Sequence, residues 1–151
     1  MKVTKKGEYA LKALLALASV YGERTLALRE IARQEKIPYK FSEQIMTLLK
    51  KTHFVESVQG KFGGYALARS PKEITLGEII RSVEGPIAPI GTAAQIRRKI
   101  QSGERYPGLY QVFLEVRDAI AEILDQKTLA EIFEKSVQLS GARTPYQMYY
   151  I

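Results

Sequence analysis

The chain has 151 residues, 46% of them hydrophobic and 26% charged, which fits one small globular domain with an appendage. It contains no cysteine, so it has no disulfide or thiolate ligand, and its single histidine is too little to anchor a metal site. The sequence contains no run of about 18 apolar residues, the length that a membrane-spanning helix needs. Charged residues interrupt the N-terminal stretch, where a signal peptide would need an apolar core. We therefore expect a cytoplasmic protein without a membrane partner, a catalytic site, a metal or another cofactor.

The net charge of +7 is unevenly distributed. Residues 1–85 contain 15 Lys and Arg against 9 Asp and Glu, whereas residues 86–151 contain 8 against 7. A basic first half predicts a polyanionic partner for that half, with double-stranded DNA as the leading candidate. A membrane surface is the rival partner, but it favours a single basic amphipathic helix, and here the cations are spread over several predicted elements.

Apolar periodicity predicts three helices in the first third of the chain. The first runs from Thr4, a good N-cap residue, to Tyr21. The second covers residues 28–36 and follows Ala27, which is a poor cap, and the third covers residues 38–52. Two short helices joined by a brief turn, the second with a polar outer face, match a helix-turn-helix.

The helix predicted over residues 38–52 has two different faces. Its apolar stripe, at spacing i, i+4, i+7 and i+8, comprises Phe41, Ile45, Leu48 and Leu49. Its opposite side comprises Tyr39, Glu43, Thr47 and Lys50. An aromatic ring, a carboxylate, a hydroxyl and an amine are groups that read base edges and contact phosphates. An ordinary solvated helix face is the alternative interpretation.

A β-hairpin is predicted directly after this helix. Residues 55–58 and 65–68 have strand character, and the glycine-rich stretch 59–64 between them favours a turn. A helix-turn-helix followed by a hairpin is a winged helix. Gln59 and Lys61 would then lie at the tip of the wing, from which a side chain can reach a minor groove. A purely structural hairpin is the alternative.

The second half is also predicted to be helical. Thr75 and Glu78 form a capping-box pattern that starts a fourth helix, and residues 93–101 suit a short basic helix. A long helix over 109–126 precedes a last helix that restarts at Thr128. The long helix carries a near-heptad apolar stripe, which we expect to be a dimer interface formed by Leu109, Val112, Phe113, Val116, Ile120, Ile123 and Leu124.

Several motifs of the chain occur together in one known family. They are Gly7-Glu8-Tyr9-Ala10-Leu11, Leu28-x-Glu30-Ile31-Ala32, Ser42-Glu43-Gln44-Ile45, Val55-x-Ser57, Gly60-x-x-Gly63-Gly64-Tyr65-x-Leu67, and Ile74-Thr75-Leu76 followed by Ile79-Ile80. With these motifs the chain resembles the IscR/NsrR/CymR (Rrf-type) family of bacterial winged-helix transcription regulators. The resemblance is strong over residues 1–85 and extends only to the topology over residues 105–135.

The resemblance implies a homodimer in which the long helix crosses to the partner subunit and paired winged helices read a palindromic operator. It places Ser42, Glu43 and Gln44 nearest the bases. Family members that carry an iron–sulfur cluster hold it with three cysteines in the loop after the fourth helix. An ungapped match puts Thr92, Arg98 and Glu104 at those positions, so we expect no cluster here. Gln59 stands where other members have an arginine at the wing tip, so an A·T-selective minor-groove contact is not carried over.

We therefore predict a mainly α fold with a small β-hairpin, a winged helix-turn-helix domain plus a long C-terminal dimerisation helix. The expected segments are a DNA-binding domain over 1–85, a loop or sensor region over 86–108, dimerisation helices over 109–140 and a tail over 141–151. The predicted function is a dimeric transcription regulator and repressor, with a small-molecule or protein effector left open. A protein-interaction module that kept the winged fold and lost specific DNA binding is the alternative. The predicted DNA-binding residues are Lys5, Lys6, Tyr9, Tyr39, Lys40, Ser42, Glu43, Gln44, Lys50, Gln59, Gly60 and Lys61.

Overall fold

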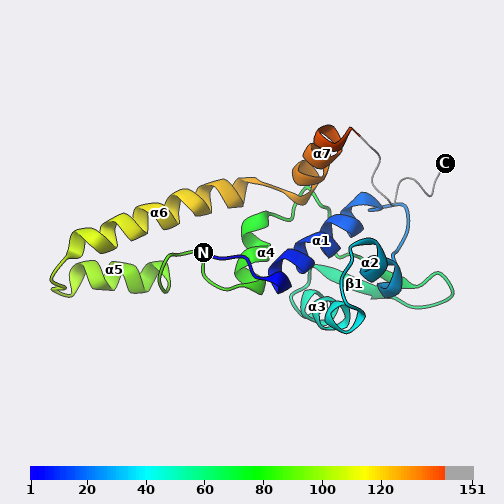
Figure 1. Ribbon diagram of the computed structural model, residues 1–151, viewed down its shortest axis with the longest axis horizontal. Coiled ribbons are helices and arrows are strands. Elements are labelled where there is room, and N and C mark those ends of the chain that lie inside the picture. Colours follow the sequence, from blue (N-terminus) through cyan, green and yellow to red (C-terminus); the bar gives the residue numbers. More distant parts are fainter. Residues whose placement is uncertain (142–151) are drawn as a thin grey trace.

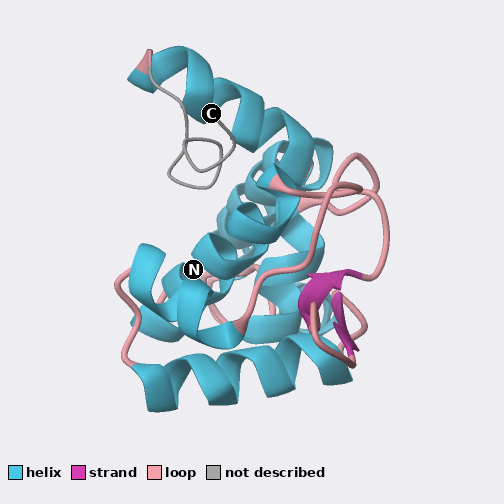
Figure 2. Cartoon of the chain, turned by 90° about the vertical axis from the view of Figure 1, so that its right-hand side faces the viewer, coloured by secondary structure: helices cyan, strands magenta, loops and turns pink. Residues whose placement is uncertain are grey.

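The computed structural model describes residues 1–141, which form seven helices and one antiparallel pair of strands (Figure 1). In chain order they are α1 (Lys5–Ser19), α2 (Leu28–Gln34), α3 (Tyr39–Lys51), β1 (Val55–Val58), β2 (Gly64–Leu67), α4 (Leu76–Val83), α5 (Ala93–Gln101), α6 (Pro107–Gln126) and α7 (Leu129–Ser140). The strands lie at one edge of a molecule otherwise built from helices (Figure 2). The predicted mainly α fold with a small β-hairpin is confirmed. Predictions about the tail beyond Gly141 lie outside the described residues.

Threonine caps set the starts of four helices. The side chains of Thr4, Thr75, Thr92 and Thr128 each accept a hydrogen bond from a backbone N–H in the first turn of the helix that follows. Three of these helices, α4, α5 and α7, have complete capping boxes. Helix α6 begins at Pro107 rather than at residue 109, because proline suits the first turn, where its missing N–H costs nothing.

One apolar core holds α1 to α4, the hairpin and the start of α7 together. Its side chains include Leu14, Leu17, Ile31, Ile45, Leu49, Ile79 and Leu129, all 0–1% exposed. Leu129 opens α7, so that helix packs on α1 instead of continuing in the direction of α6 (Figure 1). Burial of this set fixes which face of α3 turns outward.

The hairpin pairs Val55 with Leu67 and Val58 with Gly64. A third segment extends its edge, since Leu26 and Tyr65 exchange both backbone hydrogen bonds at 3.0 and 2.8 Å. Gly64 is required for this approach, because a Cβ there would collide with the Leu26 carbonyl. The hairpin is thereby attached to the segment that leads into α2.

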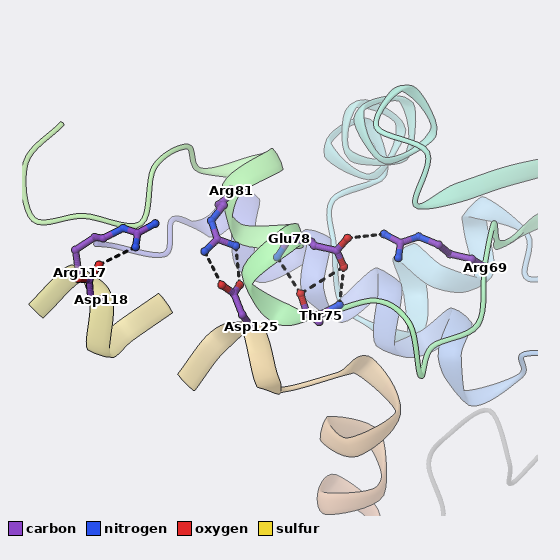
Figure 3. Close-up of polar contacts among 7 residues, drawn as sticks. All are labelled: Arg69, Thr75, Glu78, Arg81, Arg117, Asp118 and Asp125. Atoms are coloured by element: carbon purple, nitrogen blue, oxygen red, sulfur yellow. Dashed lines mark hydrogen bonds and ion pairs between the residues drawn. The ribbon is translucent and has the colours of Figure 1, made fainter. Parts of the chain in front are cut away.

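Helices α5 and α6 lie side by side and extend away from the winged part of the chain (Figure 1). The C-terminal end of α6 lies against α4. There the Arg81 guanidinium donates to both carboxylate oxygens of Asp125 at 2.6 and 2.9 Å (Figure 3). Backbone bonds reinforce this junction, with Leu76 N donating to Lys127 O at 2.8 Å and Leu129 N to Ile74 O at 2.9 Å. Among the described residues, no helix is long and apolar enough to cross a membrane.

Candidate nucleic-acid interface

Helix α3 buries one face and exposes the other. Ile45, Met46 and Leu49 are 0–1% exposed. The exposed side chains are Tyr39, Lys40, Glu43, Gln44, Thr47, Lys50 and Lys51. This face carries four charged groups, three of them cationic, and it follows the short helix α2 as a recognition helix follows the first helix of a helix-turn-helix.

Ser42 is an exception among the predicted DNA-binding residues, and we withdraw it from that set. Its side chain is 1% exposed, and its hydroxyl donates to the Tyr39 carbonyl at 2.6 Å. The buried positions of α3 are 42, 45, 46 and 49. Of the expected stripe, Ile45 and Leu49 are therefore buried, while Phe41 and Leu48 are half-buried and pack against the core. A small serine fits this stripe because its hydroxyl is satisfied by its own helix.

Lys50 links the exposed face of α3 to the wing. Its Nζ donates to Ser57 Oγ on β1 at 2.8 Å. The hydroxyl of the exposed Thr47 donates to the Glu43 carbonyl, one turn earlier in the same helix, at 2.8 Å. Glu43 and Gln44, exposed one turn earlier, are therefore the better-placed groups for contact with base edges.

Helix α2 adds two arginines that the sequence analysis missed. Arg29 lies over the Tyr39 ring, with its Cζ 5.9 Å from the ring centroid, and Arg33 is exposed one turn further along α2. Together with Ile37 they border a shallow hollow of about 340 Å³ between α2 and α3. Their i, i+4 spacing on the exposed side of α2 was a signal available in the sequence.

The start of α1 brings lysines to the same region. Lys5 and Lys6 are exposed in the first turn. Tyr9 is half-buried, and its ring meets Phe41 of α3 edge to face with centroids 5.5 Å apart, so it joins the two helices. The pKa of Glu8 is lowered mainly by a hydrogen bond from Lys12 and, to a smaller extent, by one from Lys5, so Glu8 remains ionised beside these two lysines.

The tip of the wing exposes Gln59, Gly60 and Lys61, as the sequence predicts for a surface turn. It also exposes Phe62, a residue that the sequence analysis did not select. The Thr25 hydroxyl donates to the Phe62 carbonyl at 2.8 Å, and Gly63 N donates to Gly60 O at 3.0 Å. The tip is therefore held by backbone contacts while its side chains remain outside.

The region after α4 does not provide ligands for an iron–sulfur cluster. Thr92 caps α5, and Glu104 accepts a hydrogen bond from Lys99 at 3.2 Å, which raises the pKa of that lysine. The third matched position is the cation Arg98, and the sequence has no cysteine. Within residues 1–141, no group of three or more His, Cys, Asp or Glu side chains is placed to hold a metal ion. The donor set does not fit a thiolate-held cluster.

Helix α6 keeps an apolar row at its surface. Leu109, Val112, Val116 and Ile123 are between 41% and 60% exposed. The remaining predicted interface residues, Phe113, Ile120 and Leu124, are half-buried. A helix of 20 residues is about 30 Å long, so this row is long for a surface left to solvent.

A helix-turn-helix with a hairpin wing and an outward basic face defines a winged-helix transcription regulator. The sequence over residues 3–135 matches the Rrf2 family, described as "Iron-dependent Transcriptional regulator". The chain belongs to this family of DNA-binding, helix-turn-helix transcriptional regulators.

Individual relatives cover nearly the whole chain. The HTH-type transcriptional regulator CymR of Bacillus subtilis is 32% identical over 149 residues, 99% of each chain. IscR of Pectobacterium carotovorum is 33% identical over 94% of this chain and 85% of its own. Among solved structures, that of CymR, the global cysteine regulator of B. subtilis, is similar with a TM-score of 0.76 and covers 89% of this chain and 98% of its own. The structure of T. potens IscR is similar with a TM-score of 0.73 and covers 99% of this chain and 97% of its own. Both structures are 32% identical to this chain. The resemblance expected from the motifs is confirmed.

Proposed function

We propose that this chain is a homodimeric repressor that binds a palindromic operator without an iron–sulfur cluster. The observation that carries the proposal is the exposed face of α3, on which Glu43 and Gln44 lie with Lys40 and Lys50. Contacts of α3 with α1, α2 and β1 bring the exposed cations of those elements to the same part of the molecule. In this arrangement phosphate-binding groups lie near base-reading groups, as specific recognition requires. The proposed phosphate contacts are Lys5, Lys6, Arg29, Arg33, Tyr39, Lys40 and Lys50.

The dimer in this proposal is built on the exposed row of α6. Two copies of the row, related by a two-fold axis, would cover each other, and the paired α3 helices would then meet two half-sites of one operator. Repression follows when such a dimer occupies a promoter. The same proposal assigns DNA binding to residues 1–85, a loop or sensor role to 86–108 and dimerisation to 109–140. It also includes a cytoplasmic location.

An effector, a small molecule or a protein, has a candidate place next to α5. Ile90, Ile96, Arg98 and Lys99 border a hollow of about 410 Å³ there, within the size range of small-molecule sites. Lys99 is paired with Glu104, so the apolar wall and the Arg98 guanidinium favour a small organic anion over a cationic ligand.

The test is a binding selection on randomised duplexes, followed by titration of the enriched duplex and a generic duplex at two salt concentrations. Both affinities should fall with salt, because phosphate contacts release counterions. The enriched sequence should be a palindrome and should bind the tighter. A reporter carrying that sequence over its promoter should be repressed. Lys135→Ala, on α7, is the control that should leave the salt slope unchanged. Absence of any duplex binding at low salt would show a protein-interaction module instead.

A further inference from the structure

The side chain of Phe62 is 84% exposed at the tip of the wing. Among the large hydrophobic side chains of residues 1–141 that remain exposed, this fraction is the highest, ahead of Leu139 at 79%. Single exposed apolar residues are common, so exposure alone means little. Two further features indicate a function for Phe62: its position at the tip of the wing and the backbone contacts that fix the turn around it.

The wing tip holds the backbone of Phe62 while leaving its ring outside. The Thr25 hydroxyl binds the Phe62 carbonyl at 2.8 Å, and Gly63 N binds Gly60 O at 3.0 Å. Gly60 has φ +113°, in the region that favours glycine, and a Cβ on Gly63 would collide with the Val58 carbonyl. The tip is therefore a tight turn with a fixed backbone, so little order is lost when the ring enters a binding partner.

The cation next to Phe62 in the turn favours a nucleic acid as that partner. On the other side, Phe62 borders a hollow with Glu23, Arg24 and Glu30, where Glu30 is paired with Arg24. The Lys61 ammonium lies 5.8 Å from the centre of the Phe62 ring. Its other neighbours along the turn, Gln59, Gly60 and Gly63, have no apolar side chain. Val58, directly before the turn, is 40% exposed, so the apolar surface near Phe62 is small. A cation beside one protruding ring suits a groove whose rim is phosphate and whose floor is stacked bases. The tip is also continuous with the proposed DNA surface, because Lys50 of α3 binds Ser57 of β1.

We propose that Phe62 is an apolar wedge that enters the minor groove and partly unstacks one base step in each half-site. This inference rests on the proposed function, and it goes beyond it by assigning DNA deformation to one residue. Wedges of this type kink a duplex toward the major groove, and pyrimidine–purine steps unstack most easily. Each wing therefore selects a flexible step without a hydrogen bond to its bases. Lys61 holds the adjoining phosphates.

The experiment uses the full chain and the duplex enriched by selection, with 2-aminopurine replacing single adenines along the site. Wild type should raise the 2-aminopurine fluorescence at one step of each half-site and bend an end-labelled duplex in an energy-transfer assay. Phe62→Ala should remove both signals and bind about tenfold more weakly, in line with the loss of one aromatic–base contact. Phe62→Leu, which keeps a wedge, should retain part of both signals.

Two controls separate the wedge from other losses. Leu139→Ala removes an equally exposed apolar side chain on α7 and should change neither signal. Lys61→Ala should weaken binding and its salt dependence while the unstacking signal persists on the saturated duplex. Wild type that binds the duplex without unstacking or bending, or Phe62→Ala indistinguishable from wild type in both signals, overturns the wedge and leaves the proposed function intact. The second result would assign the ring to a protein partner. Wild type that binds no duplex overturns both.

Discussion

The Glu84 carboxylate is hydrogen-bonded to Thr4, the residue that caps the start of α1, although the two residues are 80 positions apart in the chain. Its Oε1 accepts hydrogen bonds from Thr4 N at 2.8 Å and from Thr4 Oγ1 at 2.7 Å. Thr4 is the N-cap of α1, and Glu84 is the C-cap of α4, directly before the segment that leads to α5. One carboxylate therefore connects that segment to the turn that carries Lys5 and Lys6.

Removal of this carboxylate should loosen the start of α1. Glu84→Ala should lower the free energy of unfolding by about 1 kcal/mol, the usual net value of an intramolecular hydrogen bond. It should also speed amide exchange at residues 5–8 and weaken binding to all duplexes alike, because Lys5 and Lys6 lose their fixed position. Hydrogen exchange and duplex titration check this. Glu84→Gln keeps an acceptor oxygen, so its stability, exchange rates and DNA affinity should lie between those of wild type and Glu84→Ala. Unchanged exchange in Glu84→Ala would show that Thr4 caps α1 without help.

A second variant tests the same contact from the other side. A Cβ at Gly7 would overlap the Glu84 carboxylate, which is the far end of a flexible side chain and can move away. Alanine favours a helix over glycine by about 1 kcal/mol, so Gly7→Ala should cost little overall stability. We expect it to lose the Thr4 contact and to reproduce the exchange and DNA-binding behaviour of Glu84→Ala. Tighter DNA binding than wild type would contradict the connection.

The exposed row of α6 predicts a concentration-dependent dimer. Val116→Glu combined with Ile123→Glu places two charges in that row, at positions 41% and 60% exposed in the single chain. Because both sites are open, each protomer should still fold, and sedimentation should change from dimer to monomer with loss of affinity for the palindrome. Glu115→Gln with Glu122→Gln, on exposed neighbouring positions, should stay dimeric. Wild type that sediments as a monomer at micromolar concentration would rule out this interface.

The sequence predicted those parts of the fold that depend on local patterns. Threonine caps and the glycine-rich turn mark the element ends within a few residues, because caps and positive φ angles are local requirements. The contacts that join elements were not predictable, since Leu26 with Tyr65, Arg81 with Asp125 and Thr4 with Glu84 are far apart in the chain. Ser42 entered the predicted set because the family resemblance places it near the bases, whereas its burial with Ile45 and Met46 depends on how α3 packs on the core.

Glu43 and Lys50 should act on DNA in different ways. A carboxylate only accepts hydrogen bonds, so Glu43 should face a cytosine amino group in the major groove. Glu43→Ala should relax the preference at one position of each half-site by about 1–3 kcal/mol, with generic affinity unchanged or raised because a negative charge is gone. Lys50→Ala should weaken all sequences alike and lower the salt slope by about one. Parallel selections on randomised duplexes check both. Identical enriched sequences from wild type and Glu43→Ala would show that Glu43 reads no base.

The ion pair between Arg81 and Asp125 should make stability depend on pH in the acid range. The Arg81 guanidinium donates two hydrogen bonds to the Asp125 carboxylate, and these lower its pKa from the ordinary value of 3.8. A lowered pKa in the folded chain means that the stabilisation is fully present above 3.8 and is lost as the pH falls through the folded value. The side chains are 36% and 45% exposed, which limits the contribution to about 0.2–1 kcal/mol.

Chemical denaturation of wild type and Asp125→Asn over a pH series measures this contribution. The variant keeps the shape of the side chain and loses its charge, so it should be less stable at pH 6. The difference should shrink below pH 3.8 as the wild-type carboxylate takes up its proton. Asp118→Asn is the matched control, because Asp118 pairs with Arg117 within α6 and its loss leaves α4 and α6 joined. Gly77, where a Cβ would collide with Asp125, allows this close approach of α4 to α6. If the difference between wild type and Asp125→Asn stays constant from pH 6 to pH 3, packing at Gly77 holds the junction and the charge adds nothing.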